Sequence, residues 1–182
     1  FQRVFKRRAG RHTTGLAGSG SRDYRADALF VPEAHSFSLG APRTAGPSAE
    51  PDAILRNMPG VPLGIARAAL DYVRELAEHR TDRAAGTAWP ETYRIQLAVA
   101  ESEMELSAAR YAVYGSLRHQ QQVLAQPGEI GRDDRVDTVL ARVNAFRVAR
   151  SVVSRLYDLV ATTAIYRPSP MDRWLRDLTT MR

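Results

Sequence analysis

A long amphipathic stretch near the C-terminus constrains this chain more than any other feature. Between Asp133 and Ile165, apolar side chains recur every three or four residues, which is the period of one helix face. These positions are Val136, Val139, Leu140, Val143, Phe146, Ala149, Val153, Leu156 and Val160. The stretch predicts a helix of roughly 28 residues, about 40 Å long, as the central helix of a bundle. We expect either Val143→Asp or Leu156→Asp to unfold that bundle, because a buried unpaired carboxylate is costly.

Three more helices complete the predicted bundle. Pro62–Arg80 opens with proline at a helix-start position and has an apolar face with small residues that allow close packing. Pro90–Leu124 has a second long face, and Pro170–Met181 forms a short last helix, while Thr81–Ala88 is a polar turn. Loops of about eight residues favour antiparallel neighbours. The sequence therefore predicts a mainly α fold, an up-down four-helix bundle over residues 62–182.

The segment before the bundle has a different character. Asp23–Pro32 alternates partly between apolar and polar residues and ends at a proline, so it predicts a short strand. A strand without partners is unstable, which suggests the edge of a larger sheet. Residues 34–61 are rich in proline and glycine and predict a linker. We expect three parts: residues 1–33, the linker 34–61 and the helical bundle 62–182.

Composition excludes several kinds of site. The 182 residues include no cysteine, so disulfides, thiolate metal sites and a cysteine nucleophile are excluded. The four histidines lack metal-ligand spacing, so no metal site is expected. No apolar run approaches the ~20 residues of a membrane span, and a cytoplasmic protein without a membrane partner is the expectation. Residues 1–11 hold +5 of the net charge of +6. A solvated tail is favoured there over a nucleic-acid contact, because no aromatic platform accompanies the charge.

Five motifs resemble the acyl-CoA dehydrogenase superfamily, and they occur in the family's order. They lie in Thr13–Tyr24, Leu29–Glu33, Leu63–Leu70, Arg94–Glu101 and Ala164–Asp177. The first is similar to T-G-L-R-G-T-G-S-x-D-x, and the fourth to R-x-Q-x-x-L-A-x-A-E. The last resembles S-x-I-Y-x-x-S-P-L-x-R-x-W-R-D, a form of the flavin-dependent monooxygenase branch that acts on aromatic and steroid-derived substrates. Each motif is weak by itself, but together they identify the family.

The resemblance implies the C-terminal portion of a flavin-dependent oxidoreductase or monooxygenase. Residues 1–33 would then be a remnant of the family's middle β-domain, and most of that domain and the N-terminal helical domain would be absent. The implied cofactor is FAD or FMN, and the implied partners are further copies of the chain, as a dimer or tetramer, and a separate flavin reductase. The alternative is a non-catalytic oligomerising subunit that has lost its active site. We expect the 182-residue chain to be inactive by itself.

The resemblance also implies cofactor-binding residues, namely Arg94, Gln96, Thr162 and Thr163. Arg94 matches an arginine that, in relatives, reaches a flavin phosphate in a neighbouring subunit, and a guanidinium suits phosphate oxygens. A surface arginine in the first turns of a helix is the structural alternative. Ala161–Thr163 stands where the family has Gly-Gly-Ser, and these residues could instead simply end the long helix.

No catalytic residue is assigned from the sequence. Thr179 occupies a position where the monooxygenase branch has histidine, and threonine cannot act as a base near neutral pH. The three glutamates Glu101, Glu103 and Glu105 are expected to form surface or interhelical pairs. Arg173, Arg176 and Asp177 are expected to form an interhelical ion network. Aromatic side chains at helical spacing are usually core residues, which is the expectation for Tyr111, Tyr114, Tyr157 and Tyr166.

Overall fold

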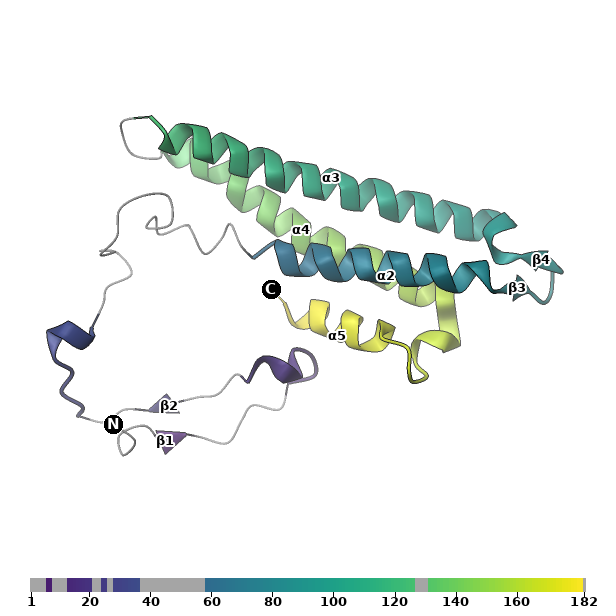
Figure 1. Ribbon diagram of the computed structural model, residues 1–182, viewed down its shortest axis with the longest axis horizontal. Helices are drawn as coiled ribbons and strands as arrows, with labels where there is room; N and C mark the ends of the chain where they lie inside the picture. Colours follow the sequence, from purple (N-terminus) through teal and green to yellow (C-terminus); the bar gives the residue numbers. More distant parts are fainter. Residues whose placement is uncertain are drawn as a thin grey trace.

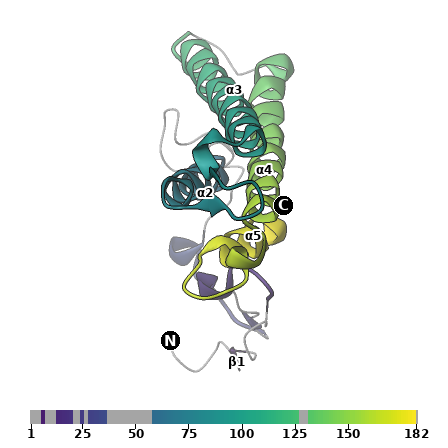
Figure 2. The ribbon, with the colours of Figure 1, turned by 90° about the vertical axis from the view of Figure 1, so that its right-hand side faces the viewer.

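The computed structural model describes residues 6–7, 13–20, 24–25, 28–36, 58–126 and 131–181. Its described part contains four α-helices, which are α2 (Gly60–Glu78), α3 (Tyr93–Leu124), α4 (Arg132–Val160) and α5 (Met171–Thr180). Successive helices run in opposite directions, and α5 packs against α4 and α2 on the side away from α3 (Figures 1 and 2). The predicted up-down four-helix bundle is confirmed. The helix ends lie within about three residues of those expected, except that α4 ends at Val160, whereas the predicted stretch runs to Ile165.

Local chemistry explains where the helices begin. Pro59 precedes α2 and Pro62 stands in its first turn, where a missing N–H costs nothing. At the start of α4, the Asp134 carboxylate accepts a hydrogen bond from the Gly131 N–H at 3.1 Å. Asp133 and Asp134 also place negative charge at the positive end of the helix dipole. These signals are local, so the sequence was sufficient to predict them.

The core lies where all four helices meet. Its largest fully buried apolar side chains are Leu70, Leu156, Met171, Val73, Val152, Val153 and Val160. Alanines on α2, α3 and α4 bring the helix backbones close together, as the small residues in the sequence predicted. In addition, Trp174 of α5 meets Tyr72 of α2 edge to face, with ring centroids 6.1 Å apart.

The predicted apolar face of α4 is correct only in the C-terminal half of the helix. Ala149, Val153, Leu156 and Val160 are buried, but Val136, Val139, Leu140 and Val143 are 40–60% exposed. In that N-terminal half, the buried positions are Thr138, Ala141 and Ala145 instead. The physical reason is that α3 and α4 extend beyond α2 and α5 (Figure 1), so this half of α4 packs mainly against α3. From α2, only Leu63 is recorded as packing against the small buried cluster there. The expectation that Val143→Asp unfolds the bundle is therefore wrong for the single chain.

The expectation for the tyrosines is also wrong at three of four positions. Tyr111, Tyr114 and Tyr166 are 75%, 51% and 68% exposed, whereas Tyr157 packs at the edge of the core. Tyr114 lines a hollow between α2 and α3, but about half of its surface stays exposed. Helical spacing indicates that residues share a face, but it does not show which face packs against another helix.

Two small β-ladders accompany the helices. β1 (Lys6–Arg7) pairs antiparallel with β2 (Tyr24–Arg25), which confirms a short β element before the bundle. The predicted strand Asp23–Pro32 is too long, because residues 28–32 form no strand and Glu33–His35 is a 3₁₀ turn. The sequence also missed a hairpin of β3 (Thr81–Asp82) and β4 (Thr87–Ala88), whose loop includes Gly86 at φ 66°. A two-residue strand leaves too little periodicity to be recognised.

Several expectations fall outside the described residues. Apart from Lys6 and Arg7, the basic arm at residues 1–11 is among them, and so is most of the predicted linker 34–61. The division at residues 33 and 61 stays a prediction. Among the described helices, none is long and apolar enough to cross a membrane. The described residues also contain no cluster of three or more potential metal-ligating side chains.

Candidate functional site

A hollow of about 670 Å³ lies at the end of the bundle where α2 ends and α3 begins. Three structural segments build it: the end of α2 with the β3–β4 hairpin, the 3₁₀ turn η4 (Trp89–Glu91) leading into α3, and the 3₁₀ turn η5 (Ala161–Ala164) that follows α4. Its lining residues are His79, Arg80, Thr81, Asp82, Arg83, Trp89, Arg94, Thr162 and Thr163. We call this hollow the basic hollow, since arginine is its most frequent charged residue.

The basic hollow brings together three of the four residues implied by the family resemblance. Arg94, Thr162 and Thr163 all line it, although Arg94 is separated from the two threonines by more than sixty positions in the chain. Gln96 does not line it, because its side-chain amide donates a hydrogen bond to the Pro90 carbonyl at 2.9 Å. The cofactor roles of all four residues stay predictions.

Arg80 organises one wall of the hollow, and sequence reasoning missed it. Its Nη2 donates a hydrogen bond to Thr163 Oγ1 at 2.6 Å, and its guanidinium carbon lies 5.0 Å from the centre of the Trp89 ring. The Trp89 N–H donates to the Arg80 carbonyl at 2.9 Å, which completes the link between the hairpin and η5. A cation near a helix C-terminus is common, so Arg80 carried no distinctive signal in the sequence.

The charge in the hollow is unbalanced. Arg83 and Arg94 are exposed and have no carboxylate partner among the described residues. The only acid in the lining, Asp82, uses Oδ1 to accept the N–H groups of Ala84 and Ala85 at 3.0 and 3.2 Å. The hollow therefore offers guanidinium N–H groups and threonine hydroxyls to an incoming acceptor. An anion such as phosphate matches this donor set.

The backbone has an unusual feature at the start of η5, directly before Thr162 of the hollow. Ala161 ends α4 with φ 48° and ψ −126°, a conformation that L side chains rarely adopt and glycine adopts freely. It is the residue that stands at the first glycine of the family's Gly-Gly-Ser. The alternative interpretation, that Ala161–Thr163 only ends the helix, is compatible with η5 following α4 directly.

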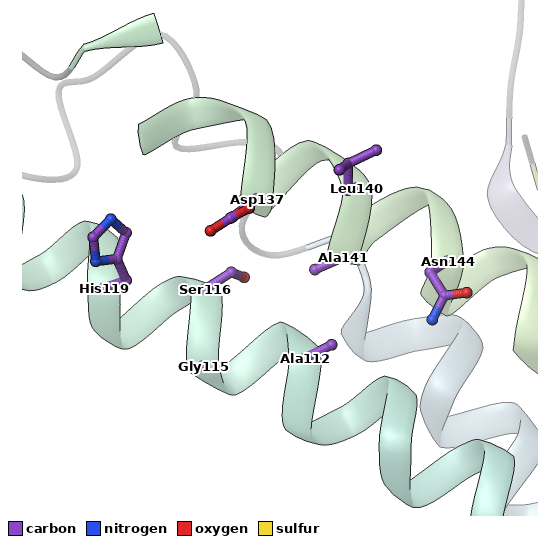
Figure 3. A pocket seen from close by; sticks show the side chains of 8 residues that line it. All are labelled: Ala112, Gly115, Ser116, His119, Asp137, Leu140, Ala141 and Asn144. Carbon is purple, nitrogen blue, oxygen red and sulfur yellow. The ribbon is translucent and has the colours of Figure 1, made fainter. Parts of the chain in front are cut away.

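A second hollow, of about 350 Å³, lies between α3 and α4 in their extended half. Figure 3 shows Ser116 and His119 on one helix and Asp137 on the other. The Ser116 hydroxyl donates to the Val113 carbonyl at 2.9 Å, and His119 Nε2 lies 3.2 Å from Asp134 Oδ1. The serine is thus not hydrogen-bonded to the histidine, and these residues do not form a nucleophilic triad.

The remaining charged candidates have structural partners. Glu103 receives two hydrogen bonds from Arg67, at 2.8 and 2.6 Å, and Glu105 receives one from Arg155 at 2.6 Å. Arg155 also lies 3.5 Å from Glu101 and donates to buried Ser102. The expectation of surface or interhelical pairs for these glutamates is confirmed.

The expectation for the last helix needs correction. Arg176 pairs with Asp172 one turn away on α5, at 2.8 Å, and Asp177 accepts the N–H of Leu16. These contacts lie within α5 and between α5 and an N-terminal loop, not between helices. The Thr179 hydroxyl donates a hydrogen bond to the Leu175 carbonyl at 2.7 Å, and its side chain is exposed.

Fold and site together define a helical domain with a basic hollow at the end where its second helix begins. A sequence profile described as "Acyl-CoA dehydrogenase, C-terminal domain" matches residues 58–182. The chain therefore belongs to the acyl-CoA dehydrogenase family and contains its C-terminal domain, as the five motifs predicted.

Individual relatives agree with this assignment. An indole-3-acetate monooxygenase of Pseudomonas putida is 32% identical over 176 residues, which cover 91% of this chain and 43% of that protein. Among solved structures, the 3-HSA hydroxylase of Rhodococcus sp. RHA1 has a TM-score of 0.83 at 19% identity and covers 97% of this chain. XiaF of Streptomyces sp., solved with FADH2 and glycerol, also has a TM-score of 0.83, at 20% identity and 98% coverage.

The match extends over only part of these proteins. The chain spans 43% of the Pseudomonas putida relative and 49% and 48% of the two structural relatives. Because the two structural relatives are only 19% and 20% identical, their similarity establishes the fold alone. The activity, substrate and assembly of these longer proteins are therefore not established for this chain by the match.

Proposed function

We propose that this chain forms the phosphate-binding end of the cofactor site in a flavin-dependent oxidoreductase of the acyl-CoA dehydrogenase family. The basic hollow carries the proposal, because Arg94, Thr162 and Thr163 line it together with Arg80 and Arg83. Arg94 and Arg83 would hold the phosphate oxygens of FAD or FMN, and the Thr162 hydroxyl would add a neutral donor. Arg80 would orient Thr163 through their 2.6 Å hydrogen bond. A bound flavin would supply the redox chemistry.

The proposed reaction class is monooxygenation of an aromatic substrate. The name of the Pseudomonas putida relative and the 3-HSA hydroxylase among the structural neighbours support this choice. Reduced flavin would come from a separate reductase. The absence of cysteine from all 182 residues suits a reducing compartment, and we propose the cytoplasm.

Flavin affinity tests the proposal. In the protein produced from the whole reading frame that contains this chain, Arg94→Ala should weaken flavin binding by about 10- to 100-fold, the usual effect of losing a charge-assisted hydrogen bond. Arg173→Ala, on exposed α5 surface outside the hollow, is the matched control. Equal flavin affinity in Arg94→Ala and the unaltered protein, measured by flavin fluorescence, would refute the phosphate role.

The isolated 182-residue chain should behave differently. We expect it to bind neither FMN nor FAD at low micromolar concentration, and to oxidise or hydroxylate nothing. The domain supplies hydrogen-bond donors for a phosphate, but the groups that tune a flavin ring must surround the ring, and the basic hollow lies at one end of the bundle. Stoichiometric binding at low micromolar flavin would contradict this expectation and show that the chain contains a complete site.

The second candidate function is a non-catalytic oligomerising subunit, and the exposed half of α4 favours it. Val136, Val139, Leu140 and Val143 form an apolar stripe on the part of α4 that extends beyond α2 and α5. We propose that a second copy of the chain covers this stripe in a homodimer or homotetramer, whichever function holds. Acidic Asp133 and Asp137 and basic Arg132 occur in the same turns, a mixture that can pair with itself across a two-fold axis.

A further inference from the structure

An N-terminal loop, residues 13–20, lies against the C-terminal helix α5. The Leu16 N–H donates to Asp177 Oδ1 at 2.6 Å, and Arg176 Nη1 donates to the Thr14 carbonyl at 2.8 Å. Both bonds join residues more than 160 positions apart. Figure 1 shows the loop, in purple, beside α5, in yellow. One bond ends on a carboxylate and the other starts from a guanidinium, so both are charge-assisted.

The loop is shaped for this close approach. Gly15 is buried, and a Cβ built on it would overlap the Arg176 carbonyl group of α5. Its neighbour Leu16 has φ 53°, in the left-handed region that costs a leucine energy. The hydrogen bond from the Leu16 N–H to Asp177 helps to hold Leu16 in this conformation. The backbone of α5 and the loop therefore fit each other only with glycine at position 15.

Arg176 is itself held in place on α5. Its Nε and Nη2 lie 3.0 and 2.8 Å from Asp172 Oδ2, one helical turn away, which leaves Nη1 for Thr14. A guanidinium that is already oriented loses less freedom when it forms the next hydrogen bond. Asp172, Arg176 and Asp177 thus present one acceptor and one donor to the loop in a fixed arrangement.

We propose that Gly15, Arg176 and Asp177 form a latch that positions loop 13–20 on α5 and so joins the segment before the linker to the helical domain. Asp177 and Arg176 act as positioning residues in this latch. The loop and the last helix would then move as one unit, although residues 21–170 separate them in the chain. This inference is independent of the proposed flavin site, since none of these residues lines the basic hollow.

Amide hydrogen exchange in the 182-residue chain tests the latch. Asp177→Ala should raise the exchange rate of the Leu16 amide by about tenfold or more, because that N–H loses a charged acceptor. Asp177→Asn keeps a carbonyl oxygen and should give a smaller increase. Thr179→Ala is the matched control on the same helix, because Thr179 is exposed and bonds only within α5. It should leave Leu16 unchanged.

Gly15→Ala provides a second test that leaves α5 unaltered. The added methyl group should separate the loop from α5 and raise Leu16 exchange to a similar extent, while amides in the middle of α2 and α4 keep their protection. Unchanged Leu16 exchange in both Asp177→Ala and Gly15→Ala would overturn the proposal. An equal rise throughout α2, α4 and the loop in Gly15→Ala would also overturn it, since the loop would then report only global stability.

Discussion

At the scale of single residues, Ala161 combines an unfavourable backbone conformation with a position directly before Thr162, which lines the basic hollow. Its φ of 48° with ψ of −126° belongs to a region that is open mainly to glycine. A Cβ in such a region costs on the order of 1–3 kcal/mol, which the surrounding structure must offset. The strain is therefore local to the residue, and a single substitution should release it.

We predict that Ala161→Gly stabilises the chain by up to about 1 kcal/mol, because the strain relieved exceeds the extra entropy of an unfolded glycine. Urea denaturation measures the change. Ala164→Gly is the control three residues later in η5, where the side chain is 1% exposed and φ needs no glycine. It should destabilise by about 1 kcal/mol. Stabilisation of both variants, or of neither, would argue against strain at Ala161.

The ion pair of Arg67 and Glu103 should make the stability of the fold depend on pH. Hydrogen bonds from Arg67 lower the pKa of the Glu103 carboxyl below 4.5. A lowered pKa in the folded state means that the pair stabilises the fold above pH 4.5, and that this contribution is lost as the pH falls through the lower value. The two side chains are 35% and 40% exposed, so solvent screening limits the contribution to less than about 1 kcal/mol.

Glu103→Gln should therefore be less stable than the unaltered chain at pH 7, and this difference in stability should shrink as the pH falls below 4.5. Urea denaturation across this range measures the difference. Glu75→Gln changes an exposed glutamate of α2 that forms no ion pair among the described residues, and it should show no such convergence. A stability difference for Glu103→Gln that stays constant down to pH 3 would contradict the pairing.

At the scale of elements, α4 consists of two halves in different surroundings. Leu156 is fully buried in the core that all four helices share, whereas Val143 is 54% exposed on the half that packs mainly against α3. Leu156→Asp should unfold the bundle, because an unpaired buried carboxylate costs several kcal/mol. Val143→Asp should keep the helical circular dichroism spectrum and melt within a few degrees of the unaltered chain. Unfolding of both variants would show that the N-terminal half of α4 is buried in the single chain.

Arg155 connects α3 to α4, and we expect its contacts to contribute to the free energy of unfolding. It bonds buried Ser102 and Glu105 and lies 3.5 Å from Glu101. Arg155→Ala should destabilise by about 1–3 kcal/mol, since the Ser102 hydroxyl loses its partner inside the interface. Arg150→Ala removes an exposed arginine from the same helix and should change the unfolding free energy by less than about 0.5 kcal/mol. Equal losses in the two variants would refute a specific role for Arg155.

At the scale of the whole molecule, the exposed stripe on α4 predicts self-association. We expect a dimer or tetramer by light scattering at tens of micromolar chain, because contiguous apolar surface of this kind is usually covered. Val143→Asp should shift the population toward the monomer without unfolding it. Tyr166→Asp, an exposed aromatic position outside the stripe, is the control and should associate normally. A monomeric unaltered chain would contradict the proposed contact between copies.

The sequence by itself determined the helices and the family. The three- to four-residue spacing, Pro59 and Pro62 before and within α2, and the acids at the start of α4 act through local geometry, so each could be recognised without knowledge of any neighbour. Motifs such as Arg94–Glu101 identified the family because a motif is recognised from the order of its residues, without a structure. The same motifs implied Arg94, Thr162 and Thr163, which the structure places around one hollow.

Tertiary structure decided which faces are covered and which distant residues meet. Val143 and Leu156 lie in one predicted face, but only Leu156 has helices around it, because α2 and α5 end before α4 does. Arg80 joined the basic hollow through Thr163 and Trp89, and Asp177 met Leu16 across the length of the chain. Periodicity records the chain's own geometry, whereas burial and pairing depend on neighbours that the spacing of residues does not specify.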